Sequence, residues 1–274
     1  MCRHPRPRCW WTALSSPAAD LALLVEAAQA AGDAAMAFFG RAKQWDKPEG
    51  AGPVTEADLA ADALLKRTLS AARPGYGWLS EETPDDAARL GHERIFIVDP
   101  IDGTRAFIAG TGGWCVAATV VEAGRPVAAA AWFPVERKLY QAAAGLGATR
   151  DGAPIRPSAR ETVGGAEVLA GAAQLEPRHW PGGAPPVRRG FRPSLVHRFC
   201  LVAEGRVDAT LSFSDAWEWD VAAGALIAAE AGCVVTDGHG APHRFNAPRP
   251  KTPGLVVAPP ALHAALMALR LGAR

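Results

Sequence analysis

The chain contains 274 residues, of which 49% are hydrophobic and 21% are charged, and its formal net charge is +1. This balance is typical of a globular protein and excludes a disordered chain. The near-neutral charge and the absence of an apolar run of roughly 20 residues exclude a basic nucleic-acid binder and a membrane-spanning protein.

Residues 1–17 precede the first predicted element and contain arginines but no acids. They lack the apolar stretch of a secretory signal, so we expect a disordered extension on a cytoplasmic protein, with a transit-like role left open. The five cysteines of the chain are scattered and odd in number, which argues against a disulfide framework. Three of them lie in apolar surroundings and are predicted to be core residues: Cys115, Cys200 and Cys233.

Two helices are predicted in the first quarter of the chain. Apolar residues recur at helical spacing in residues 15–41, after an N-cap signal. A second helix follows Thr55 as its cap, with Leu59 expected on the same apolar stripe as Leu65 and Leu69. Between them, residues 42–53 are rich in Gly and Pro and predict a hairpin or a mobile loop.

The rest of the chain mixes strands with helices. Short apolar runs separated by turn signals predict strands within residues 76–155, and a stretch crowded with Pro and Gly at 171–193 predicts irregular structure. Helices are expected at 194–205 and 220–232, each ending at a glycine, and at 261–271. Strands paired with helices in this way indicate a layered α/β or α+β architecture.

Carboxylates follow apolar runs at several of these predicted boundaries. A single acid in such a place is usually a helix cap or a solvated turn. If the fold gathers several of them, their mutual repulsion must be neutralised, and divalent cations bound by oxygen ligands do this. The acids in question are Asp58, Glu81, Glu82, Asp99, Asp102 and Asp220.

The stretch "DPIDGT" at residues 99–104 adds a place for an anion. Gly103 lets the backbone approach a ligand closely, and a helix that begins at Thr104 would direct free N–H groups and its dipole at a phosphate. Metal-binding carboxylates beside phosphate-binding amides are the groups that hydrolysis of a phosphate ester requires.

"DPIDGT", together with "WDVAAG" at residues 219–224, resembles the inositol monophosphatase family of lithium-sensitive, metal-dependent phosphatases. Lys47, "VTEAD" and "SEE" precede the two signatures in the expected order, and the resemblance covers roughly residues 18 to 270. It implies an α+β fold, a layered αβαβα sandwich of mixed sheets and helix pairs. An N-terminal sub-domain, 18–150, would bind metal and phosphate, and a C-terminal sub-domain, 151–274, would complete the active site, in a homodimer.

The resemblance also implies a role for each matched residue. Two or three Mg²⁺ ions per active site are expected, with first-site ligands Glu81, Asp99 and the Ile101 carbonyl, and second-site ligands Asp99, Asp102 and Asp220. Thr104, paired with Asp58, would activate the attacking water together with Glu81. The amides of Gly103 and Thr104 would bind phosphate, and Lys47 would lie in the mobile loop that covers the metals.

The substrate is expected to be a small phosphate ester, and its identity is the open point. Phe213 stands seven residues before Asp220, where the inositol enzymes of the family carry a substrate-binding glutamate. The runs "DGTRAFI" and "WEWDVAAG", with Arg105 and Glu218 as candidate substrate-binding residues, look more like the 3′(2′),5′-bisphosphate nucleotidases, which act on adenosine 3′,5′-bisphosphate. The alternatives are a histidinol-phosphate or inositol-1-phosphate phosphatase, and a non-catalytic relative that binds metal or phosphate without turnover.

Overall fold

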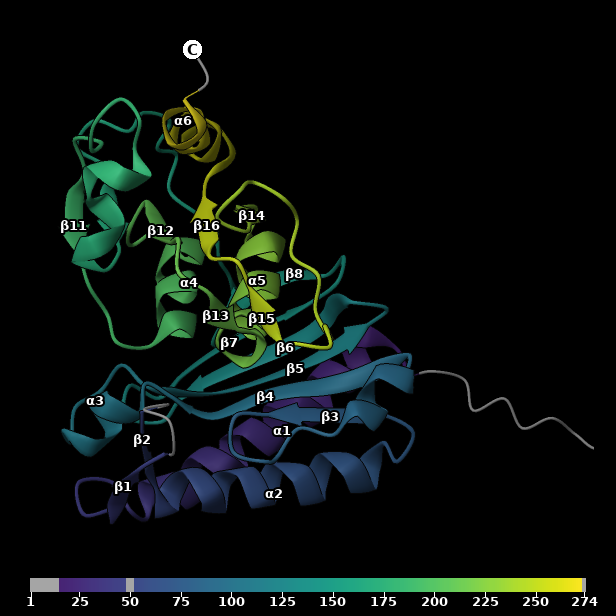
Figure 1. Ribbon diagram of the computed structural model, residues 1–274. Coiled ribbons are helices and arrows are strands. Elements are labelled where there is room, and N and C mark those ends of the chain that lie inside the picture. Colours follow the sequence, from purple (N-terminus) through teal and green to yellow (C-terminus); the bar gives the residue numbers. More distant parts are fainter. Residues whose placement is uncertain (1–14, 48–51, 273–274) are drawn as a thin grey trace, which may run out of the picture.

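The computed structural model describes residues 15–47 and 52–272. The described chain forms five layers in the order helices, sheet, helices, sheet, helix (Figure 1). The predicted αβαβα sandwich is therefore confirmed. The expected N-terminal extension falls outside the described residues, except for its last three positions, where the first helix begins.

Helices α1 (Pro17–Met36) and α2 (Glu56–Ala72) make the first layer. The hydroxyl of Ser16 accepts the N–H of Ala19 at the start of α1, and Thr55 caps α2 as predicted. The buried stripe of α2 consists of Ala57, Ala61, Leu65 and Leu69. The prediction for Leu59 was wrong, because its offset of two residues from Ala57 places it on the opposite face, where it is 44% exposed.

The second layer is a seven-stranded sheet whose strands follow the chain order, with β3 and β4 parallel and the other neighbours antiparallel. Both faces are covered, so side chains alternate between two cores. In β4, Phe96 and Val98 pack toward α1 and α2, and Ile95 and Ile97 pack toward the third layer. The strands are β3 (Gly77–Ser80), β4 (Arg94–Asp102), β5 (Cys115–Glu122), β6 (Arg125–Phe133), β7 (Lys138–Ala143), β8 (Gly147–Arg150) and β9 (Ala153–Pro154).

Helices α4 (Leu195–Ala203) and α5 (Glu218–Ala231) form the third layer, on the other face of this sheet. They approach closely at Gly224, where an added Cβ would lie 2.6 Å from the Phe199 ring. The expected core cysteines, Cys115, Cys200 and Cys233, are all buried, which confirms that prediction.

A five-stranded sheet and helix α6 (Pro260–Leu271) complete the sandwich (Figure 1). The sheet has the order β11-β10-β12-β16-β14, formed by β10 (Glu167–Leu169), β11 (Arg188–Gly190), β12 (Ala209–Ser212), β14 (Val234–Thr236) and β16 (Leu255–Ala258). The stretch predicted to be irregular, 171–193, contains β11 and the 3-10 helices η3 (Ala172–Leu175) and η4 (Pro177–His179). The division of the chain near residue 150 stays a prediction, since α4 and α5 share a core with the seven-stranded sheet.

Two short ladders lie beside the layers. Strand β1 (Gln44–Asp46) pairs with β2 (Pro53–Thr55), so the described part of the Gly/Pro-rich stretch is a hairpin. Strand β13 (Ala216–Trp217) pairs with β15 (Lys251–Thr252) just before α5. In the part of the chain that the structure describes, no helix combines the length and apolar character needed to cross a bilayer.

Candidate active site

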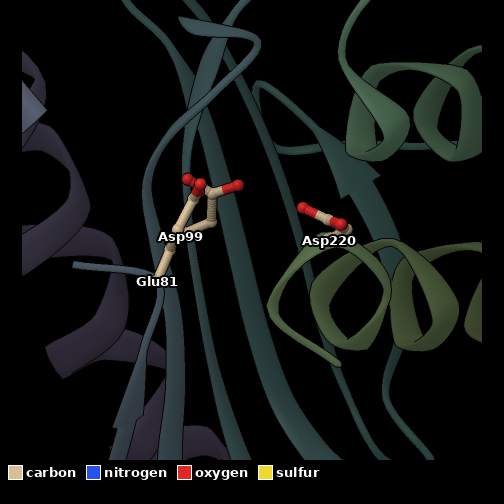
Figure 2. A group of neighbouring side chains, drawn as sticks. All are labelled: Glu81, Asp99 and Asp220. Atoms are coloured by element: carbon tan, nitrogen blue, oxygen red, sulfur yellow. The ribbon is translucent and has the colours of Figure 1, made fainter. Parts of the chain in front are cut away.

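Three carboxylates meet where the seven-stranded sheet faces the start of α5. Glu81 directly follows β3, Asp99 lies near the end of β4, and Asp220 lies in the first turn of α5. Because β3 and β4 are parallel, with Ser80 opposite Val98, their last residues reach the same edge of the sheet. One carboxylate oxygen from each acid lies within 4.8 Å of the others (Figure 2).

The electrostatics of this cluster favour a bound cation. Burial raises the pKa of Asp99 well above its usual range, and the charges of Glu81, Asp102 and Asp220 raise it further. Burial and the neighbouring acids Asp102 and Glu81 likewise raise the pKa of Asp220. An all-oxygen set that repels itself fits a hard divalent ion, whose charge would keep these groups ionised.

The end of β4 is shaped by a bulge between Asp99 and Asp102. Asp99 Oδ1 accepts the N–H of Ile101 at 2.9 Å, and the Ile101 carbonyl accepts the Thr104 hydroxyl at 3.2 Å. Gly103 has φ 101°, a conformation that favours glycine, and a Cβ there would lie 3.2 Å from Ser194 Cβ, a tight contact. Helix α3 (Thr104–Ile108) begins at the next residue, which is the helix start that the phosphate-binding interpretation of the sequence required.

Asp58 and Thr104 form the predicted pair. The backbone N–H and the hydroxyl of Thr55 both donate to Asp58 Oδ2, at 2.8 and 2.5 Å, in a capping box at the start of α2. The other oxygen, Oδ1, accepts the Thr104 hydroxyl at 3.4 Å, a long hydrogen bond. Burial raises the pKa of Asp58, and the hydrogen bonds from Thr55 oppose this effect.

Asp102 lies beside the cluster, and its carboxylate caps α4. It accepts the Ser194 hydroxyl at 2.7 Å and the backbone N–H groups of Leu195 and Val196 at 3.2 and 2.7 Å. Burial raises its pKa to about 6, although these three donors lower it. A carboxylate has about four lone-pair directions, so these bonds leave room for a metal ligand bond, and that role stays a prediction.

A family model described as the inositol monophosphatase family matches residues 18–271. The chain belongs to the inositol monophosphatase family. Membership makes it a phosphoric monoester hydrolase, and the phosphatases of this family depend on metal. The carboxylate cluster of Glu81, Asp99 and Asp220 provides an oxygen site that fits this dependence.

The chain is similar to relatives in this family whose names give different substrates. The 3′(2′),5′-bisphosphate nucleotidase CysQ of Escherichia coli (strain K12) is 33% identical over 229 residues, which cover 78% of this chain and 89% of the relative. The inositol-1-monophosphatase of Rhizobium meliloti is 34% identical over 197 residues, which cover 68% and 73%. Among solved structures, the extragenic suppressor protein suhB from Bartonella henselae matches with a TM-score of 0.78 and 27% identity, over 93% of this chain and 100% of that chain.

In this family member, Lys47 and Glu82 lie next to the carboxylate cluster and form ion pairs there. Lys47 Nζ lies 2.7 Å from Glu81 Oε1 and 2.8 Å from Glu82 Oε1. Burial lowers the pKa of Lys47, but the charges of the two glutamates outweigh it and the pKa is raised. Burial, partly offset by Lys47, raises the pKa of Glu82 to about 7. The sequence placed Lys47 over the metal site and grouped Glu82 with the converging acids, but it gave Glu82 no individual role beside Glu81 in "SEE".

A cavity of about 400 Å³ opens beside the phosphatase signature. Its lining includes Glu81, Gly103, Thr104, Arg105 and Arg198. Arg105 is exposed and lines this cavity, and its substrate-binding role stays a prediction. Sequence reasoning missed Arg198, and the signal was present, since an arginine stands between apolar residues of a helix predicted to be buried.

The expectation that Glu218 binds substrate is not supported by its position. Its side chain is fully buried, and its two carboxylate oxygens accept the backbone N–H groups of Asn246 and Ala247 at 2.7 and 2.9 Å. Phe213 also packs into the protein, with its ring 5.5 Å from the ring of Trp180. Both side chains pack within the C-terminal half of the phosphatase. Neither is among the described residues that line the cavity.

Proposed function

We propose that this phosphatase removes the 3′-phosphate of a 3′,5′-bisphosphorylated nucleoside, adenosine 3′,5′-bisphosphate in the first instance. The observation that carries the proposal is Arg198, a buried guanidinium that lines the same cavity as Thr104. Its Nε donates to the Arg192 carbonyl at 2.6 Å, and among the described residues it forms no ion pair with a carboxylate. A buried, unpaired guanidinium is suited to a second phosphate, because Arg binds phosphate oxygens through paired N–H donors.

The aromatic surface of the cavity supports the same substrate class. Phe191 is 49% exposed and lines the cavity, and the Arg198 guanidinium lies 4.7 Å from its ring centre. A nucleotide offers a planar base for such an apolar wall and a phosphate for the cation beside it. The similarity to the CysQ nucleotidase of E. coli points in the same direction.

Each rival substrate lacks a feature that this cavity would use. Histidinol phosphate carries a cationic amine, which would meet Arg105 and Arg198, and Glu218 is already bonded to backbone amides. Inositol 1-phosphate is favoured by the similarity to the Rhizobium enzyme. It has no second phosphate for Arg198, and Phe213 cannot accept a hydroxyl hydrogen bond.

The residues of the chain would divide the chemistry as follows. Glu81, Asp99, Asp220, Asp102 and the Ile101 carbonyl would hold Mg²⁺, two or three ions per site, which supply positive charge for activating water and for the leaving oxygen. The amides of Gly103 and Thr104 would bind the phosphoryl oxygens.

The hydroxyl of Thr104, 3.4 Å from Asp58 Oδ1, would accept the proton of the attacking water as its own proton moves to Asp58, with Glu81 orienting the water. A homodimer remains a prediction from the family resemblance, and a cytoplasmic location remains a prediction from the sequence.

A turnover panel tests the proposal. Phosphate release would be measured with Mg²⁺ on adenosine 3′,5′-bisphosphate, histidinol phosphate and inositol 1-phosphate at matched concentrations. We expect the highest kcat/KM for the nucleotide. A tenfold preference for either rival, about 1.4 kcal/mol in transition-state binding, would reject the nucleotidase assignment and leave the phosphatase assignment intact.

A further inference from the structure

The loop at residues 245–250 is held at its start by a buried carboxylate. Glu218, at the first position of α5, uses both carboxylate oxygens to accept the N–H groups of Asn246 and Ala247. The N–H of Glu218 in turn donates to the Pro250 carbonyl at 2.9 Å. Each of the two segments, the start of α5 and this loop, therefore donates hydrogen bonds to the other. The pairing of β13 with β15 adds further backbone contacts between them.

The same loop is held from the other side by a buried guanidinium. Arg89, in the 3-10 helix η2 (Ala87–Gly91), is 2% exposed and donates to Asn246 Oδ1 at 2.6 Å and to the Ala247 carbonyl at 2.9 Å. Its remaining bonds go to both oxygens of Asp85, at 2.6 and 2.9 Å. Asp85 lies four residues after Glu81, so these contacts lead back to the metal-binding segment.

Asn246 and Ala247 thus lie between two opposite buried charges. The carboxylate of Glu218 accepts the backbone N–H groups of Asn246 and Ala247, and the guanidinium of Arg89 donates to the side-chain Oδ1 of Asn246 and to the Ala247 carbonyl. Asn246 has φ 64°, a left-handed conformation that asparagine tolerates better than most residues. Buried charges are costly unless they are bonded in this way, so the arrangement is strongly specified.

We propose that Glu218, Asn246 and Arg89 form a clamp that positions the two sides of the metal site relative to each other. One end of the clamp is two residues before Asp220, and the other end reaches the segment that carries Glu81. A cavity of about 480 Å³, lined by Glu81, Glu82, Asp85, Trp219 and Pro248 among others, lies where these two segments meet. The bonded loop, through Pro248, lies at the edge of this space and joins the two segments there, beside the packing of α5 on the sheet.

This inference rests on the assignment of Glu81 and Asp220 as metal ligands and is independent of the substrate. A ligand set binds an ion tightly only when its oxygens are held at the right separation, and loss of the supporting bonds typically costs 10–100-fold in metal affinity. Glu218 and Arg89 are therefore positioning residues, which act through the placement of Asp220 and Glu81.

The test measures Mn²⁺ binding to the full chain without substrate, by the electron paramagnetic resonance signal of free Mn²⁺. Mn²⁺ is the probe because carboxylate, carbonyl and water ligands suit it as they suit Mg²⁺. Glu218→Gln places an amide N–H₂ against a backbone donor and breaks one half of the clamp. Asn246→Gly keeps the left-handed backbone and the N–H to Glu218 while removing the side-chain bond to Arg89, so it weakens the other half, which keeps the bond from Arg89 to the Ala247 carbonyl, with little risk to folding.

Glu230→Gln is the matched control. Glu230 lies on the same helix, near its far end, and its carboxylate also accepts two backbone N–H groups, those of Gly145 and Gly147, at 3.0 and 2.9 Å. This control should lose thermal stability without changing the Mn²⁺ dissociation constant, because Glu230 bonds to the turn at Gly145 and Gly147, away from the end of α5 that carries Asp220. Melting temperatures without metal report the purely structural effect of each variant.

We expect the Mn²⁺ dissociation constant to rise about tenfold in Glu218→Gln and in Asn246→Gly, within the range for lost supporting bonds, and to stay within twofold of wild type in Glu230→Gln. The clamp is overturned if both clamp variants bind Mn²⁺ like wild type, or if Glu230→Gln shifts binding equally. A wild-type chain that binds no Mn²⁺ would overturn the metal assignment and the clamp with it, whereas poor turnover of the nucleotide would leave both standing.

Discussion

Replacing Arg198 with methionine tests whether this side chain binds the second phosphate of the substrate and not the phosphate that reacts. Methionine keeps much of the side-chain volume and removes the guanidinium, which lines the cavity beside Thr104. A hydrogen bond to a charged group contributes about 1.5–3 kcal/mol, so kcat/KM for adenosine 3′,5′-bisphosphate should fall about 10- to 100-fold. Adenosine 3′-monophosphate has no 5′-phosphate, and its kcat/KM should change less than threefold.

The assay is phosphate release from both nucleotides at saturating Mg²⁺, with melting temperatures to report folding. Arg192→Met is the matched control, because Arg192 is exposed on the same segment and donates to the Phe191 carbonyl at 2.8 Å. Arg198→Lys keeps a positive charge and should retain more activity on the bisphosphate than Arg198→Met. An equal loss on both nucleotides in Arg198→Met would refute the assignment, since the guanidinium would then act on the fold or on the reacting phosphate.

Three further outcomes are expected. Asp220→Asn should lower phosphate release at least ~100-fold with the fold intact, because it removes a charged metal ligand; near-normal rates at saturating Mg²⁺ would contradict this. Thr104→Ala and Asp58→Asn should each lower kcat more than they raise KM, and the double variant should lose little more, whereas additive losses would show separate roles. Burial, with Arg192 nearby, lowers the pKa of His197 to about 4, so folding stability present above the unfolded pKa of about 6.5 is lost as pH falls toward 4. Urea unfolding at pH 7 and pH 5 should show a loss of at most about 2 kcal/mol that is absent in His197→Gln.

Local sequence signals predicted the elements of the fold well, because their causes are local. The cap at Thr55 needs only Asp58 three residues later, and the structure shows both bonds of that capping box. Leu59 shows the limit of reading a stripe from composition, since two of the four apolar residues on the buried face of α2, Ala57 and Ala61, are alanines that carry little hydropathy signal. Which face of a helix is buried depends on its neighbours in space, and the chain order alone does not give them.

The candidate site likewise has residues that the sequence could place and one that it could not. Glu81, Asp99 and Asp220 could be grouped from two signatures, and the structure brings them together. Glu218 could not be placed, because its partners, Asn246 and Ala247, are 28 and 29 residues away in a loop without a motif. An acid next to a signature therefore has two possible surroundings, the cavity or the loop behind it, and tertiary structure decides between them.

The contact between Gly224 and Phe199 limits which substitutions the chain tolerates at these two positions. Gly224 ends the "WDVAAG" signature, one turn after Asp220, and any side chain there would meet the Phe199 ring. A larger residue would push α5 away from α4 and carry Asp220 with it, so a genetic screen for inactive variants should recover changes at 224 that touch neither metal nor substrate. Second-site suppressors of such variants should map to position 199 and carry a smaller side chain, which makes the helix contact and the metal ligand a single heritable unit.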